Sequence, residues 1–252
     1  MGIQLSLDGQ RALVTGSSSG LGPVIARALD EAGAEVILHY NTHREGAERT
    51  AASLSRTGGV LQADLSVSGG AADLFHRAAE GGPVTILVNC AAVESQEISP
   101  LIDLETSRWS DTLRSNVEAP FELIRCFARQ GVQGSVINIS SIEGSRPASA
   151  HGHYATSKAA LDMLTRSAAL ELGPAGIRVN AIAPGLIWRQ GIEEGWPEGV
   201  AAWKTAAPLG RLVSPEDIGA AVVFLASGLA ASMTGTVLTV DAGVSVRPGW
   251  GI

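Results

Sequence analysis

The segment Arg11–Gly22 reads RALVTGSSSGLG, an apolar run followed by glycines at positions 16, 20 and 22. The run Arg11–Thr15 predicts a short buried strand, and Leu21–Ala32 predicts a helix that ends at Gly33. Glycines between a strand and a helix permit a sharp turn and let a phosphate approach the amides at the helix N-terminus. The spacing G-x-x-x-G-x-G differs from G-x-G-x-x-G and lacks the Lys of a P-loop. The segment indicates a nucleotide-binding turn, with a bare strand–helix connection as the alternative.

Outward from this segment, apolar runs and helical patterns alternate along the whole chain. Continuous apolar strands are typical of a sheet buried on both faces, and the βαβ order predicts parallel strands with right-handed crossovers. We therefore expect an α/β fold of one domain, residues 1–252: a doubly wound (Rossmann-type) parallel sheet with helices on both faces. The further strands are expected at Glu35–Tyr40, Val60–Ala63, Thr85–Asn89, Ser135–Ser140, Arg178–Ile182 and Val237–Val240. The further helices are expected at Glu45–Ser55, Ala71–Ala79, Arg108–Arg129, Tyr154–Leu172 and Pro215–Ala226.

Residues 185–212 form the one segment with an irregular pattern, rich in Gly, Pro and Trp. Ligands of doubly wound sheets bind beyond the carboxyl ends of the strands. A long insertion there is more typical of a substrate lid or wall than of a disordered loop. We therefore expect residues 185–212 to be a substrate-lid insertion.

Composition narrows the function classes. The net charge of −7 argues against nucleic acid or an anionic membrane surface as a partner. The two cysteines and five histidines show no clustered spacing, so we expect neither a metal site nor a disulfide framework. The chain shows no secretory leader pattern and no apolar run of about 18 residues. We expect a cytoplasmic protein that acts on a small molecule.

Tyr154 and Lys158 are four residues apart in a helical pattern, so their side chains share one helix face. A nearby ammonium favours the phenolate and lowers the tyrosine pKa from about 10 towards working pH, which suits an acid/base. Such a pair is usually incidental by spacing alone. Ser141, thirteen residues before Tyr154, stands at the carboxyl end of an apolar strand, where its hydroxyl would face the crevice. Its neighbour Ser140 should face the other side of the strand.

Taken in order, these motifs resemble the short-chain dehydrogenase/reductase family, in its branch of about 250 residues. Thr15–Gly22 matches the family's T-G-x-x-x-G-x-G, and Ser141 with Tyr154-x-x-x-Lys158 is similar to its catalytic set. The further matches are Asp64-Leu65, Asn89-Cys90-Ala91-Ala92 in place of N-N-A-G, Asn116, Pro184-Gly185, and Val240–Gly243 in place of V-D-G-G. Ile187-Trp188-Arg189 stands where relatives often have a threonine that bonds the carboxamide, and backbone groups of Ile187 are the expected substitute.

The resemblance implies an NAD(P)-dependent oxidoreductase that interconverts a secondary alcohol and a ketone, or a sugar hemiacetal and a lactone. Tyr154 would move the proton, Ser141 would hold the reacting oxygen, and Lys158 would bind the nicotinamide ribose and lower the tyrosine pKa. Asn116 would hold a water that passes the proton to solvent, and the nicotinamide would carry the hydride. The cofactor-binding residues so implied are Gly16, Ser18, Ser19, Gly20, Leu21, Gly22, Tyr40, Asn41, Thr42, Arg44, Asp64, Leu65, Asn89, Ala91, Ala92, Tyr154, Lys158, Pro184, Gly185 and Ile187.

The end of the second strand favours NADP over NAD, with dual use left open. An acidic residue there would bind the ribose 2′-hydroxyl and repel a 2′-phosphate, but this chain has Tyr40 followed by Asn41 and Thr42. Arg44 could then contact the phosphate, or it could be a solvated residue of the next helix. Ser19 argues the other way, because NADP-preferring relatives often have Arg or Lys at that position.

Beside Ser141 and Tyr154, we expect substrate contacts from Glu143, Arg146, His153 and Trp188, whereas His151 is expected in a solvated loop. The polar loop and the histidines favour a sugar or polyol. The alternatives are a 3-oxoacyl thioester reductase and, from another class, a non-catalytic nucleotide-sensing protein. Apolar helix faces at Arg108–Arg129 and after Tyr154, together with the resemblance, predict a homotetramer.

Overall fold

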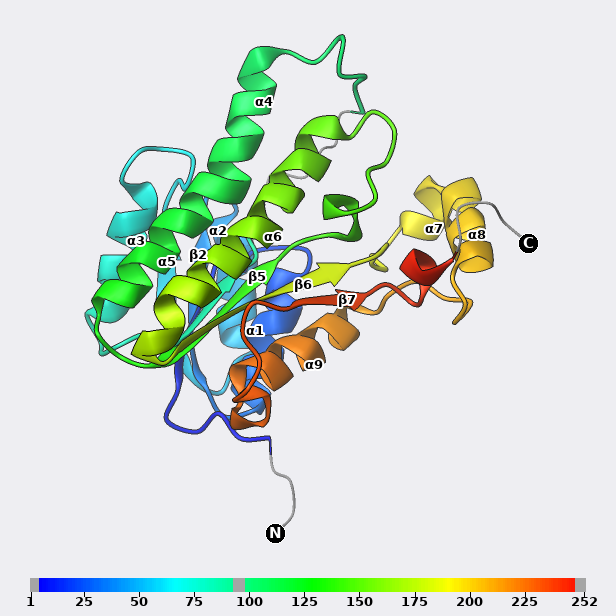
Figure 1. The fold of residues 1–252 in the computed structure, drawn as a ribbon. Helices are drawn as coiled ribbons and strands as arrows, with labels where there is room; N and C mark the ends of the chain where they lie inside the picture. The colour runs from blue at the N-terminus through cyan, green and yellow to red at the C-terminus, as the bar shows by residue number, and fades with distance from the viewer. Residues whose placement is uncertain (1–4, 93–97, 248–252) are drawn as a thin grey trace.

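The computed structural model describes residues 5–92 and 98–247, and strands alternate with helices throughout them (Figure 1). The described residues form a seven-stranded parallel sheet in the order β3-β2-β1-β4-β5-β6-β7. The predicted strands are all present, most of them with shifted ends. Their bounds are β1 (Arg11–Val14), β2 (Glu35–Tyr40), β3 (Thr57–Gln62), β4 (Ile86–Asn89), β5 (Gly134–Ile139), β6 (Ile177–Pro184) and β7 (Val237–Val240).

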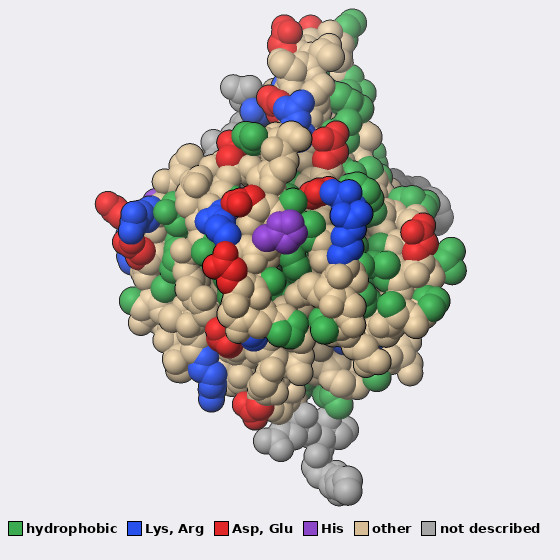
Figure 2. All heavy atoms as spheres, turned by 90° about the vertical axis from the view of Figure 1, so that its left-hand side faces the viewer, with side chains coloured by type: hydrophobic (Ala, Val, Ile, Leu, Met, Phe, Trp, Pro, Cys, Tyr) green, Lys and Arg blue, Asp and Glu red, His purple; other side chains and the backbone are tan. Residues whose placement is uncertain are grey.

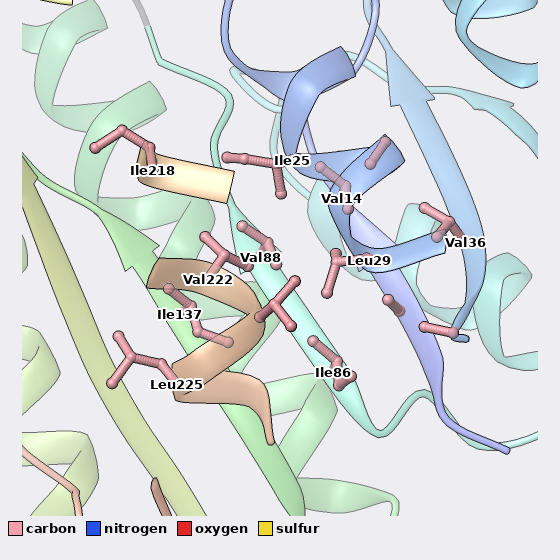
Figure 3. Close-up of a cluster of buried hydrophobic side chains, with 14 of the residues drawn as sticks. Val14, Ile25, Leu29, Val36, Ile86, Val88, Ile137, Ile218, Val222 and Leu225 are labelled. Carbon is pink, nitrogen blue, oxygen red and sulfur yellow. The ribbon is translucent and has the colours of Figure 1, made fainter. Parts of the chain in front are cut away.

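Helices cover both faces of the sheet, each over its own apolar cluster. On one face α1 (Gly22–Glu31), α2 (Arg44–Ala52) and α9 (Pro215–Ala226) pack on side chains that include Val14, Val88 and Ile137 (Figure 3). On the other face α3 (Gly70–Ala79), α5 (Ala119–Arg129) and α6 (Gly152–Leu172) pack around Phe75 and Phe127. Burial of this apolar surface on both sides stabilises the fold and explains why the strands are continuously apolar. The doubly wound α/β fold is confirmed.

Local signals set the helix boundaries where they are strong. The Ser214 hydroxyl accepts from the backbone N–H of Glu216, and the Asp217 carboxylate accepts from the Ser214 N–H at 3.1 Å. With Pro215 in the first turn, this capping box starts α9 at the predicted residue.

The predicted continuous helix over Arg108–Arg129 is wrong in one respect. The chain forms α4 (Thr106–Leu113), then a π-helical turn over Arg114–Glu118, and then α5. Pro120 has no N–H to donate to the carbonyl four residues earlier, which is that of Asn116, and its ring would clash there. The widened turn accommodates the proline and carries Asn116.

The expectation of irregular structure over residues 185–212 is also corrected. The segment contains α7 (Ile192–Gly195) and α8 (Pro197–Ala206), which lie beyond the carboxyl ends of β6 and β7 (Figure 1). Ile192, Val200 and Leu212 form a small apolar cluster with Leu186 and Trp203 packed against it. This cluster is separate from the two that cover the sheet.

The distribution of charged side chains on the surface is relevant to the partners that the protein could bind. Figure 2 shows basic and acidic side chains side by side on one face of the described protein, rather than a patch of one sign. In the described part of the chain, no helix combines the length and apolar character needed to cross a bilayer.

Candidate active site

The strand order reverses between β1 and β4, so the loops that follow these two strands flank a crevice at the carboxyl edge of the sheet. The Thr15 hydroxyl oxygen accepts from the backbone N–H groups of Cys90 and Ala91, each at 3.0 Å, and so joins the two loops. Thr15 is buried and was not among the expected site residues. Its position just before the first glycine was the available signal.

The glycine loop forms a cradle that side chains would fill. A Cβ on Gly22 would lie 2.2 Å from the carbonyl oxygen of Gly16, and one on Gly16 would lie 2.8 Å from the Cα of Ala91. Gly20 has φ +61° with nothing within 4 Å of a Cβ, so its backbone faces open space. Ser18, Ser19 and Leu21 complete the loop up to the start of α1. These residues fit the pyrophosphate of a dinucleotide at a helix N-terminus.

The end of β2 lies against this loop. Tyr40 is half-buried, whereas Asn41, Thr42 and Arg44 are exposed. Arg44 forms a 2.7 Å ion pair with Glu48, so its guanidinium has a partner on its own helix.

A second contact joins α2 to the loop. A Cβ on Gly46 would lie 2.1 Å from the Ser18 carbonyl oxygen and 2.6 Å from the ring of His43. His43, not among the expected residues, therefore lies over the first turn of α2 beside the glycine loop. Nothing in its spacing distinguished it from a solvated residue.

At the end of β3, Asp64 and Leu65 are half-buried. The Asp64 carboxylate accepts from the backbone N–H of Ser66 at 2.9 Å and from its hydroxyl at 2.6 Å, and these bonds hold the pKa of Asp64 below its usual value. Asn89, also expected in the cofactor site, is 3% exposed, and its side-chain amide donates to Asn138 at 2.8 Å. Asn89 thus joins β4 to β5 beneath the crevice, while Ala91 is half-buried and Ala92 exposed at the surface.

The predicted proximity of Tyr154 and Lys158 is observed. The Lys158 Nζ lies 5.4 Å from the centroid of the Tyr154 ring and donates to the Ile139 carbonyl oxygen at 2.9 Å. Lys158 is 3% exposed, whereas Tyr154 is half-buried. The ammonium is thereby held between the end of β5 and the tyrosine ring.

Ser141 follows β5 in extended conformation and begins a 3₁₀ turn over Ile142–Gly144. Its hydroxyl oxygen accepts from the Glu143 backbone N–H at 3.1 Å. Ser140 is buried and its hydroxyl donates to the Lys158 carbonyl oxygen at 3.4 Å, so it faces α6. The two serines therefore point to different sides, as predicted.

The π turn places Asn116 against α6. Its side-chain amide donates to the Ser157 hydroxyl at 3.0 Å, and that hydroxyl donates to the Tyr154 carbonyl oxygen at 2.7 Å. Asn116 is 1% exposed. It is thus fixed next to the turn of α6 that carries Tyr154 and Lys158, although Ser157 was not expected in the site.

The loop before α6 differs from the expectation for His151. This ring is half-buried, and its Nδ1 lies 3.1 Å from Oε2 of Glu143, which contradicts a purely solvated position. His153 is 2% exposed, and its two ring nitrogens have no hydrogen-bond partner within the described residues. Burial, Arg108 and His151 lower the pKa of His153. Arg146 is exposed and reaches the Arg247 carbonyl oxygen at 3.4 Å.

The segment that follows β6 borders the candidate site on the side of β6 and β7. A Cβ on Gly185 would lie 2.5 Å from the Trp203 ring, so Gly185, next to Pro184, provides the space for that tryptophan. Ile187 pairs with Val213 in a parallel bridge, and the Trp188 side chain is 48% exposed. Across residues 5–92 and 98–247, no three His, Cys, Asp or Glu side chains gather as metal ligands would.

Comparison with known proteins agrees with this arrangement. Residues 16–245 match a protein-family model described as "Enoyl-(Acyl carrier protein) reductase". The chain is 37% identical to 3beta-hydroxysteroid dehydrogenase 1 of Eggerthella lenta, over 97% of both chains. It is 36% identical to galactitol 2-dehydrogenase of Rhizobium johnstonii, over 94% of this chain and 95% of that one.

A solved structure shows the same fold. It comes from a Beutenbergia cavernae protein assigned as an NAD(P)-dependent gluconate 5-dehydrogenase, which contains bound NADP. The two chains superpose with a TM-score of 0.89 at 33% identity, over 97% of this chain and all of that one.

Proposed function

The chain belongs to the short-chain dehydrogenase/reductase family and is an NAD(P)-dependent oxidoreductase of alcohols and ketones, and from this premise we propose that it acts on a sugar or polyol. The alcohol would be secondary or a sugar hemiacetal. The alternatives are a hydroxysteroid, as in the Eggerthella relative, and an acyl thioester.

The Glu143–His151 pair carries the substrate proposal. Glu143 follows Ser141 by two residues, and its carboxylate and the His151 imidazole are both half-buried. An apolar substrate packed here would strip water from these two groups without replacing its hydrogen bonds, which is costly. Substrate hydroxyls would replace them. Galactitol and gluconate dehydrogenases among the similar proteins support this choice.

The positions of the side chains support the proposed chemistry. A bound nicotinamide supplies or accepts the hydride. The Tyr154 phenol exchanges a proton with the substrate oxygen, and the Lys158 ammonium beside its ring stabilises negative charge on the phenol oxygen. Since the Ser141 oxygen accepts from a backbone amide, its hydroxyl proton remains to be donated to the same substrate oxygen. Asn116 maintains the geometry of this part of α6 and is proposed to hold the water that connects Lys158 to solvent.

The proposed cofactor is NADP in preference to NAD. The segment Tyr40–Arg44 has no carboxylate to repel a 2′-phosphate, His43 lies near the Ser18 carbonyl oxygen, and Arg44 is the first residue of α2. The Beutenbergia structure binds NADP, which supports the same choice.

We also propose a homotetramer. The supporting observation is a set of exposed apolar side chains on or near the helices of one face: Leu101, Ile102, Phe121, Met163 and Leu170. Apolar side chains left exposed on the helices of one face favour burial against a second copy of the chain. Light scattering after gel filtration tests the mass.

Residues 185–212 are proposed as the substrate lid within a single domain, since their small apolar cluster lets them move as a unit over the end of the sheet.

A cytoplasmic location is proposed as well. Cys126 belongs to the cluster on one side of the sheet and Cys90 packs against the cluster on the other, so the two cannot form a disulfide with each other.

A substrate panel tests the proposed function. Polyols, aldonates, 3-hydroxysteroids and 3-oxoacyl thioesters are compared by absorbance of the reduced nicotinamide, each with NADP(H) and NAD(H). We expect the highest kcat/KM with a polyol or aldonate. A steroid or thioester preferred by more than about tenfold would contradict the substrate class. Nucleotide binding without turnover of any member would favour the nucleotide-sensing alternative.

A further inference from the structure

His39 lies one residue before the end of β2 and is 2% exposed. The backbone N–H of Gly16 donates to its Nδ1 at 3.1 Å, and its Nε2 lies 3.1 Å from the carbonyl oxygen of Ala63. A carbonyl oxygen only accepts, so Nε2 carries the ring proton, while Nδ1 must hold a lone pair for the amide. Both contacts therefore require the neutral Nε2–H tautomer.

The two partners of this ring lie in two different loops of the nucleotide site. Gly16, with φ +69°, is the first glycine of the cradle, and Ala63 directly precedes Asp64 and Leu65. Backbone groups also join the end of β2 to the glycine loop. The His39 N–H donates to the Ser17 hydroxyl oxygen, and the Ser17 N–H donates to the His39 carbonyl oxygen, both at 2.9 Å. The end of β2 thus ties the loop after β1 to the loop after β3.

The charged groups that face this ring are few. Arg77 of α3 lowers the pKa of His39 and Asp64 raises it, but burial is the largest cause and brings the pKa to about 4. The Arg77 guanidinium is itself bonded to Asp73 and to the Gln62 carbonyl oxygen. The imidazole is therefore neutral near pH 7, as its two contacts require.

We propose that His39 is a positioning residue of the nucleotide site, which fixes the Gly16 amide and the Ala63–Asp64 backbone before the cofactor binds. This inference rests on the proposed function of the glycine loop. Without the imidazole acceptor, the half-buried Gly16 amide loses its partner and the loop has more conformations to give up on binding. Loss of the imidazole should therefore weaken cofactor binding and leave the rate of the chemical step at Tyr154 unchanged.

Two amide variants separate the two arms of the ring. In His39→Asn the side-chain oxygen takes the place of Nδ1 and keeps an acceptor for Gly16. In His39→Gln the amide reaches the place of Nε2 and keeps only the contact with Ala63. We expect the NADPH Kd to stay within about threefold of wild type for His39→Asn and to rise about tenfold for His39→Gln. The kcat at saturating cofactor and the KM of the alcohol should change less than about twofold in both.

Fluorescence titration of NADPH into the folded variants gives these Kd values, with circular dichroism as the check of folding. An unchanged Kd in folded His39→Gln overturns the proposal. If wild type binds neither NADPH nor NADH, the proposed function fails instead. The two failures are therefore distinguishable.

Wild-type measurements keep the test independent of the variants. Nitrogen NMR of the His39 ring should show the Nε2–H tautomer both without and with NADPH, and an Nδ1–H tautomer or an imidazolium near pH 7 contradicts the proposal. Hydrogen exchange of the Gly16 amide should already be slow without NADPH. Fast exchange that slows only on cofactor binding shows that the loop is not set in advance.

Discussion

The proposed nucleotide end and the proposed substrate end of the crevice are held in different ways. At the nucleotide end, Thr15, Ser17 and His39 are at most 2% exposed, and their hydrogen bonds connect the loops after β1, β3 and β4. At the substrate end, Arg146 and Trp188 are exposed, and the Glu143–His151 pair is only half-buried. If the first end holds the cofactor, as we propose, its buried contacts suit one kind of ligand, whereas side chains at the proposed substrate end can change without disturbing the sheet. A family that combines one cofactor with many alcohols needs this division.

The junction of the two ends should give the largest effect. Tyr154→Phe removes the proposed proton donor but leaves the glycine loop intact, so we expect kcat to fall by at least about 1,000-fold with an unchanged NADPH Kd. Steady-state rates and fluorescence titration measure the two quantities. Turnover within tenfold of wild type would sink the proposed chemistry.

Within the nucleotide end, two glycines provide a matched pair. Gly22→Ala places a Cβ 2.2 Å from the Gly16 carbonyl oxygen, and we expect the NADPH Kd to rise about 100-fold as the loop is displaced. Gly20→Ala meets no atom within 4 Å and carries only the strain of its positive φ, so its Kd should rise less than about tenfold. Equal effects in the two variants would show that the cradle is not close-packed.

The buried histidine makes the stability of the fold depend on pH. The pKa of His39 is about 4 in the folded chain against an ordinary 6.5, so the unfolded chain binds the proton first as pH falls through this window. The free energy of unfolding should therefore decrease by about 2 kcal/mol between pH 7 and pH 5 through this residue. Urea denaturation of wild type and His39→Asn at both pH values isolates the contribution as the difference in their pH dependence. Identical pH dependence of the two would contradict it.

At the proposed substrate end, a substitution should change the KM of the alcohol and leave cofactor binding unchanged. Glu143→Gln removes the charge that we propose to bind substrate hydroxyls, and the KM of the best polyol should rise about tenfold with an unchanged NADPH Kd. Glu80→Gln, exposed after the C-terminus of α3, serves as the control and should leave both values alone. A Glu143→Gln variant with the wild-type KM for polyols would show that this carboxylate does not bind the substrate.

The smallest effect is expected at the exposed edge of the nucleotide end. Arg44 is 72% exposed at its side chain and already paired with Glu48. Arg44→Ala should therefore raise the NADP Kd only about threefold and leave the NAD Kd unchanged. An equal change in the Kd of NADP and of NAD would show that Arg44 does not recognise the 2′-phosphate.

The sequence predicted the sheet and the residue types of the site, because buried parallel strands and the glycine turn have strong local patterns. The π turn at Asn116 was missed because a proline inside a helical pattern indicates an irregularity but not its form. The small helices between Ile192 and Ala206 were missed because their pattern is short and contains Gly and Pro.

The site was predicted less completely than the fold. Contacts such as His39 with Gly16 and Glu143 with His151 depend on how separate elements meet in space. A histidine in an apolar strand has the same local pattern whether or not a loop amide lies against its ring.

The widened turn at Asn116 also sets the rotational phase of the chain that follows it. A π turn holds about one residue more than an α turn, and each α-helical residue advances the rotation by about 100°. Deleting one residue between Arg114 and Glu118 would remove the extra residue of the turn and would rotate Leu123 and Phe127 away from the sheet on which α5 packs. The same extra residue therefore positions the amide beside Tyr154 and keeps the core in register. A length change at this turn would affect activity and folding together.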